Sequence, residues 1–109
     1  LIDGELSVQW HEVEARLAEG WRLIDVRTAG ENALGAIPGS TLMPVDELRE
    51  HAESLRGQRV IVHCKVGQRG HTAAALLRQY GVIVANLDGG YMTWRAGTQA
   101  VAASAGSAS

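Results

Sequence analysis

Phenylalanine is absent from this sequence, and cysteine occurs once among its 109 residues. Aromatic packing therefore falls to three tryptophans and two tyrosines. A single thiol cannot form an internal disulfide, and a free thiol suits a reducing compartment, so we expect a cytoplasmic protein. The length is enough for one domain with its own core and too short for two.

Long apolar runs and clusters of one charge are also missing. No run approaches the ~20 apolar residues that span a bilayer, and no basic segment followed by an apolar stretch marks a signal peptide. Ten basic and twelve acidic residues are spread evenly, so no basic face for nucleic acid is expected. No cluster of histidine and cysteine has metal-ligand spacing, so we expect no metal site.

The remaining sequence alternates between two hydrophobic periods. Apolar residues at Ala73, Leu76, Leu77 and Tyr80 follow helical spacing, whereas the consecutive β-branched residues 60–62 are typical of a strand buried on both faces. This alternation predicts a three-layer α/β domain with a central, mostly parallel sheet. Helices are predicted over Ser7–Glu19, Val45–Leu55, Gly70–Tyr80 and Tyr91–Arg95, strands over Trp21–Val26, Thr41–Met43, Arg59–His63 and Val82–Leu87, and a loop over Thr28–Ser40, which holds four Gly or Pro.

The two ends of the chain differ in composition. Residues 1–96 form the predicted domain, and residues 97–109 are mainly Ala, Ser and Gly. Such a tail buries little apolar surface, so we expect it to be disordered. The first residue is Leu1 rather than Met, which indicates a trimmed N-terminus or a domain cut from a longer chain.

The candidate chemical centre is the segment that begins at Cys64. This cysteine follows a buried strand, and ligands of open α/β sheets bind beyond the carboxyl ends of the strands. The helix that follows offers unpaired N–H groups and a positive dipole end, which together favour an anion and the thiolate form of cysteine. The predicted anion-binding loop comprises Lys65, Val66, Gly67, Gln68, Arg69 and Gly70.

A lone cysteine is often only a small buried hydrophobe. Here the strand end, the helix start and two flanking cations agree, and Gly67 lets the loop curl. These features favour a nucleophilic role for Cys64.

Four ordered segments resemble the rhodanese family. The spacing of Cys64 and Arg69, with four residues between them, is that of the family's active-site loop. The other three segments are Leu23–Arg27, similar to an Asp-x-Arg strand end, Gly35–Ser40, similar to Gly-His-Ile-Pro-Gly-Ala, and Asp88–Trp94, similar to Gly-Gly-aromatic-x-x-Trp. The resemblance extends over residues 6–96.

This resemblance implies an α/β/α domain with a five-stranded sheet and an enzyme that needs no cofactor. Cys64 would attack the outer sulfur of thiosulfate or a thiol persulfide, hold it as a persulfide, and pass it to cyanide or a thiol. Arg69 and the loop amides would stabilise the persulfide, and Lys65 would attract the donor. Asp25 and Arg27 are interpreted as structural supports, and Glu31 as a residue of the pocket rim.

Residues 66–70 also resemble rhodanese domains fused to flavin-dependent reductases of the coenzyme A-disulfide type. A fused or separate reductase domain of that kind would then be a partner. Two positions depart from the family pattern: Ala36 replaces a histidine, and Asn32 replaces an aromatic residue. Both bear on rim packing and substrate choice rather than on the nucleophile.

Two alternative functions follow from the same residues. A related phosphatase or arsenate reductase has a loop longer by one residue, and its arginine would stand where this sequence has Gly70. A non-catalytic rhodanese-like binding module is the second alternative, which the presence of Cys64 disfavours. His63 is interpreted as an interior or edge histidine whose polar groups are satisfied, not as a base.

Overall fold

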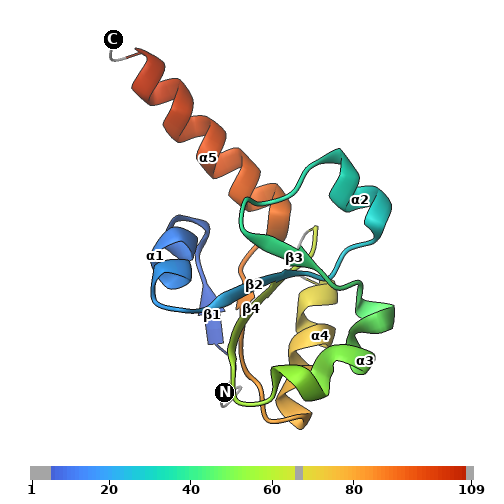
Figure 1. Cartoon of the computed structure of the whole chain (residues 1–109). Coiled ribbons are helices and arrows are strands. Elements are labelled where there is room, and N and C mark those ends of the chain that lie inside the picture. Colours follow the sequence, from blue (N-terminus) through green and yellow to red (C-terminus); the bar gives the residue numbers. More distant parts are fainter. Residues whose placement is uncertain (1–5, 66–67, 108–109) are drawn as a thin grey trace.

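The computed structural model describes residues 6–65 and 68–107. Its centre is a five-stranded sheet of order β1-β5-β4-β2-β3, in which every pairing is parallel (Figure 1). The predicted parallel α/β architecture is therefore confirmed. The strands are β1 Leu6–Val8, β2 Arg22–Asp25, β3 Ser40–Leu42, β4 Arg59–His63 and β5 Ile83–Leu87.

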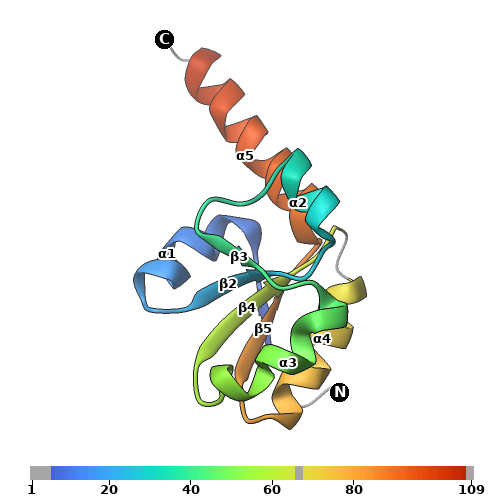
Figure 2. The same ribbon diagram turned by 45° about the vertical axis from the view of Figure 1, so that its right-hand side comes forward.

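Helices cover both faces of this sheet (Figures 1 and 2). One buried cluster joins the strands to α3 and α4, and a second joins them to α1 and the start of α5. Side chains alternate along each strand, so Val62 of β4 enters the first cluster and Ile61 the second. The helical elements are η1 Trp10–Glu12, α1 Val13–Ala18, α2 Ala29–Leu34, η2 Val45–Glu47, α3 Leu48–Ala52, η3 Glu53–Leu55, α4 Gln68–Gln79 and α5 Gly90–Ser107.

Two predicted segments near the N-terminus are wrong. Residues 7 and 8 belong to strand β1, not to the first helix, because they pair with β5, which lies almost eighty residues further along the chain. The predicted loop 28–40 contains α2, which opens with a capping box between Thr28 and Glu31. That Thr-x-x-Glu pattern is a sequence signal for a helix start.

The last helix is longer than the predicted 91–95. The residues expected to be disordered continue α5 as far as Ser107, and this end projects from the rest of the molecule (Figure 1). Alanine has the highest helix propensity, so a helix anchored at its start by packing continues through this segment. The domain boundary after residue 96 stays a prediction. No described helix combines the length and apolar character that crossing a membrane requires.

Candidate active site

Cys64 lies immediately after β4, the middle strand of the sheet, at its carboxyl edge. Its residue is 1% exposed and belongs to the buried cluster that includes Val62 and Ala73. The next residue, Lys65, is exposed. Val66 and Gly67 of the predicted loop lie outside the described residues, and α4 begins at Gln68, two residues earlier than predicted. The predicted order of strand, cysteine and helix is therefore present.

The backbone of Cys64 and Lys65 is held by the start of α5. The Tyr91 N–H donates a hydrogen bond to the Cys64 carbonyl at 2.7 Å, and the Met92 N–H donates to the Lys65 carbonyl at 3.0 Å. Gly90 makes this approach possible, because a Cβ there would lie 2.5 Å from the Cys64 carbonyl oxygen. Its φ of +63° also favours glycine. The Gly-Gly-aromatic segment, which the sequence marked only as a family signature, thus supports the cysteine.

The first turn of α4 packs closely on β5. A Cβ at Gly70 would collide with the side-chain oxygen of Asn86, a buried residue of β5. The Asn86 Nδ2 lies 3.5 Å from Nε2 of His71, and its Oδ1 has no hydrogen-bond partner among the described residues. Gly70 therefore permits the contact between α4 and the sheet, and sequence patterns gave no indication of Asn86.

Asp25 and Arg27 form a buried ion pair at the end of β2. The Asp25 carboxylate accepts hydrogen bonds from Nε and Nη2 of Arg27, at 2.9 and 2.8 Å, and from Asn32 Nδ2 at 2.9 Å. Burial alone would raise the pKa of Asp25, but these hydrogen bonds outweigh it and keep the pKa below its usual value. The Arg27 guanidinium also donates to the Gly35 carbonyl and lies 4.3 Å from the Tyr91 ring centroid. The pair connects β2 and the loop after α2 to the start of α5.

Glu31 and Arg69 form a second, partly exposed pair. The two Arg69 nitrogens donate to the two Glu31 oxygens at 2.7 and 2.8 Å. These hydrogen bonds, together with one from the Thr28 backbone N–H, lower the pKa of Glu31 to about 2. The same contact raises the pKa of Arg69. The guanidinium predicted to serve the persulfide is thus oriented by a carboxylate of α2.

His63 is fully buried at the end of β4, where it pairs in register with Asp25 of β2. The interior position predicted for His63 is confirmed, and its hydrogen bonding stays a prediction. Burial lowers its pKa to about 4, and the neighbouring Asp25 charge only partly opposes this effect. His63 is therefore neutral at pH 7.

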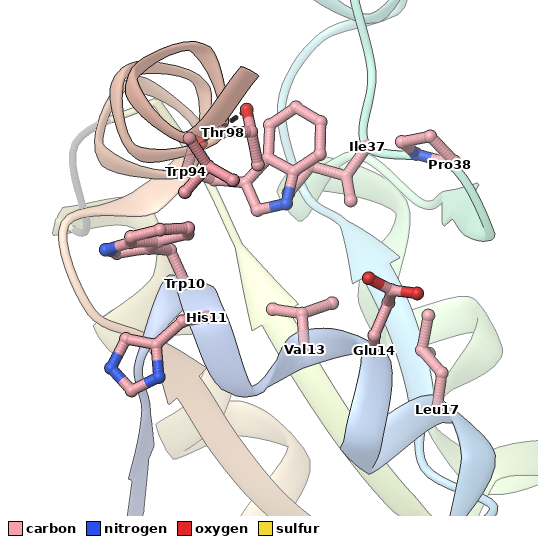
Figure 3. Close-up of a pocket in the computed structure, with 10 residues that line it drawn as sticks. Trp10, His11, Val13, Glu14, Leu17, Ile37, Pro38, Trp94 and Thr98 are labelled. Atoms are coloured by element: carbon pink, nitrogen blue, oxygen red, sulfur yellow. Dashed lines mark hydrogen bonds between the residues drawn. The ribbon is translucent and has the colours of Figure 1, made fainter. Parts of the chain in front are cut away.

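Two cavities flank α5. One, of about 280 Å³, opens beside Lys65 and is lined by Arg27, Glu31, Leu34, Gly35, Lys65, Tyr91, Met92 and Arg95. The other, of about 510 Å³, is mainly apolar and lies between η1, α1, the loop before β3 and the middle of α5 (Figure 3). The Cys64 loop lines none of the larger cavity. Within residues 6–65 and 68–107, no group of three or more His, Cys, Asp or Glu side chains is placed to hold a metal ion.

The fold and this site define a class of α/β domain whose cysteine follows a central parallel strand and precedes a helix. The sequence model of the rhodanese-like domain matches residues 9–97, and the chain belongs to that family. The resemblance noted in the sequence is thereby confirmed.

Relatives of known name agree with this assignment. The chain is 32% identical over 108 residues to a human thiosulfate:glutathione sulfurtransferase, covering 84% of this chain and 94% of the relative. It is 36% identical over 74 residues to a sulfurtransferase of Allochromatium vinosum, covering 66% and 69%.

Two solved structures give the same result. The reduced CoADR-RHD of Bacillus anthracis is 38% identical, with a TM-score of 0.77 over 84% of this chain and 16% of that longer chain. A human single-domain sulfurtransferase is 31% identical, with a TM-score of 0.71 over 81% of this chain and 93% of the other.

Proposed function

We propose that the chain is a sulfurtransferase that carries sulfane sulfur on Cys64. The observation that carries this proposal is the place of Cys64, at the end of the middle strand and ahead of the first turn of α4. That position puts a nucleophile near the positive end of a twelve-residue helix. The family assignment and the sulfurtransferase relatives support the same chemistry.

The reaction would proceed in two balanced steps. In the first, the Cys64 thiolate attacks the outer sulfur of thiosulfate; the new S–S bond forms as the donor S–S bond breaks, and sulfite leaves with the bonding electron pair. In the second, an acceptor thiolate or cyanide attacks the terminal sulfur, and Cys64 leaves as a thiolate. Neither step needs an external oxidant or reductant, and alternation between two enzyme forms predicts ping-pong kinetics.

The residues around Cys64 would have distinct tasks. The start of α4 stabilises the anionic persulfide through its unpaired N–H groups, and Arg69, oriented by Glu31, adds positive charge. Lys65 attracts the anionic donor from the exposed side. The buried pair of Asp25 and Arg27 supports the surrounding backbone rather than the reacting atoms.

Partner and compartment are part of this proposal. Similarity to the rhodanese part of CoADR-RHD supports a flavin-dependent disulfide reductase domain, fused or separate, as partner. A single cysteine, which cannot form an internal disulfide, supports work in the reducing cytoplasm. The alternative, a non-catalytic binding module, would not require a cysteine in this position.

A mass measurement tests the proposal. The protein is incubated with thiosulfate, freed of excess reagent, and compared with Cys64→Ser by intact mass. We expect the mass of one added sulfur atom in the wild type alone, removed by cyanide. If neither thiosulfate nor a thiol persulfide loads Cys64, the binding module is the better account.

A further inference from the structure

The larger of the two cavities shares no described lining residue with the cavity beside Lys65 (Figure 3). Its volume of about 510 Å³ lies within the ~300–1,000 Å³ that is typical of cavities for organic ligands. Seven of its ten lining residues are apolar, and they include two of the three tryptophans. The proposed sulfur transfer uses none of these residues, so the cavity needs a separate explanation.

Packing holds both tryptophans in place at the wall of this cavity. The Trp94 ring stacks on Tyr91, with ring centroids 5.9 Å apart and planes inclined by 28°. A Cβ at Gly97 would overlap the Trp10 ring, so this ring lies directly against the backbone of α5. The two indoles are therefore largely fixed before any ligand enters, which lowers the entropic cost of binding.

The polar side chains of the wall leave one negative charge without a partner. The Thr98 hydroxyl donates to the Trp94 carbonyl of its own helix at 2.9 Å, and His11 packs edge-on against the Trp10 ring. Glu14 of α1 makes no ion pair within residues 6–65 and 68–107, and no lysine or arginine of those ranges lines the cavity. The wall therefore combines aromatic rings with an uncompensated carboxylate.

This combination favours a cation over other ligands. The indole is the aromatic side chain that attracts a cation most strongly, and a carboxylate pairs with an ammonium group. An anion would be repelled by Glu14, and an uncharged ligand would gain nothing from it. The projecting end of α5, residues 99–107, holds no basic residue. The same helix of a second copy would thus not match the charge of this wall.

We propose that this cavity binds an organic amine with an apolar body, whose ammonium group contacts Glu14 and whose body packs against Trp10 and Trp94. Glu14 is exposed, so the ammonium group stays partly hydrated while the apolar body is buried. The site is distinct from Cys64, and its ligand does not depend on the proposed sulfur transfer.

Three probes with the same apolar body test the charge preference. At pH 7, 4-phenylbutylamine is a cation, 4-phenylbutan-1-ol is neutral and 4-phenylbutyrate is an anion. Binding is followed through the indole N–H resonances of the ¹⁵N-labelled protein, which has three tryptophans. Trp21 lines neither of the two cavities, so its resonance is the internal control.

We expect the amine to shift the resonances of Trp10 and Trp94 and to leave that of Trp21 in place. Its affinity should exceed that of the alcohol about fivefold, which corresponds to an exposed charge contact combined with a weak cation–π contact. The anion should bind more weakly than the alcohol.

Two variants show whether the Glu14 charge sets this preference. Glu14→Gln should bind the amine about threefold more weakly than wild type and the alcohol equally well. Glu50→Gln is the matched control, because Glu50 is an exposed acid of α3 that does not line the cavity. This variant should bind all three probes as wild type does.

Several results would overturn the inference. Equal affinities for amine and alcohol would show that the wall does not select a cation. An equal loss of amine affinity in Glu50→Gln would assign the effect to net charge rather than to the cavity. A chain that sediments as a dimer, with Trp10 and Trp94 resonances that do not respond to the amine, would show that a second copy covers the cavity instead.

Discussion

Replacing Gly90 by alanine is expected to damage both the stability of the domain and its sulfur transfer. A Cβ at this position would lie 2.5 Å from the Cys64 carbonyl oxygen and 2.8 Å from the carbonyl carbon and oxygen of Lys65. These are backbone atoms, so no side-chain rotation relieves the overlap. The start of α5 and the residues after β4 must therefore move apart.

The magnitude follows from two contributions. An alanine at a φ of +63° costs about 1 kcal/mol relative to glycine. Separation of the two segments breaks the hydrogen bonds from Tyr91 and Met92, which are worth about 1 kcal/mol each. We therefore expect a loss of about 3 kcal/mol in the free energy of unfolding. The rate of persulfide formation should fall by about tenfold or more, because small displacements of a nucleophile are costly.

Gly57→Ala provides the matched control. Gly57 also has a positive φ, of +78°, but a Cβ there meets no atom within 4 Å. It should lose only about 1 kcal/mol and load sulfur at the wild-type rate. Urea unfolding and the time course of sulfur uptake by mass measure both quantities. If Gly90→Ala matches Gly57→Ala in both, the contact between α5 and Cys64 does not support the site.

Three further results are expected. Burial keeps His63 neutral in the folded protein, with a pKa of about 4, so the unfolded chain takes up a proton first as the pH falls through 6.5. Wild type should therefore lose about 2 kcal/mol of unfolding free energy between pH 7 and pH 5. In urea unfolding, His63→Phe should lack this loss with pH, and an equal loss in both proteins contradicts the prediction. Glu31→Gln should cost about 1 kcal/mol of unfolding free energy at pH 7, because it removes one charge of the partly exposed pair with Arg69. The pKa of Glu31 is lowered from 4.5 to about 2, so the difference in stability between wild type and variant should shrink as the pH falls between those values. A difference in stability that stays constant over this pH range argues against the pair. Gly70→Ala should cost about 2 kcal/mol of unfolding free energy, because the added Cβ overlaps the Asn86 side chain. In a double-mutant cycle, the same substitution should cost less in the presence of Asn86→Ala. Strictly additive losses would show that the Cβ at position 70 does not overlap Asn86.

Local patterns predicted the main helices and strands well. The helix after Cys64 and the strand before it were found because their apolar residues repeat with clear periods. Strand β1 was missed because its three residues are too short for a period and are stabilised only by β5. The extent of α5 was missed because a composition of Ala, Ser and Gly is shared by flexible tails and by helices continued from a packed start.

The candidate site also combines features that neighbouring residues predict with contacts that only the fold creates. Cys64 and its loop stand out in the sequence because a strand end, a glycine and two cations are neighbours along the chain. The pairing of Glu31 with Arg69 joins residues 38 positions apart, and the contact of Gly90 with Cys64 joins two separate strand ends. Neither contact has a local signature.

Sequence periodicity and the Cys64 segment were enough to predict an α/β domain, most of its elements and a candidate nucleophile, because these depend on residues close together in the chain. The folded arrangement alone placed α2 and α5 around Cys64, left Lys65 and Arg95 without ion pairs among the described residues, and buried His63 beside Asp25. These features depend on strand order, since the sequence β5-β4-β2 brings the ends of three distant segments to one edge of the sheet. Packing across such an edge is a property of the whole fold, and no short stretch of residues encodes it.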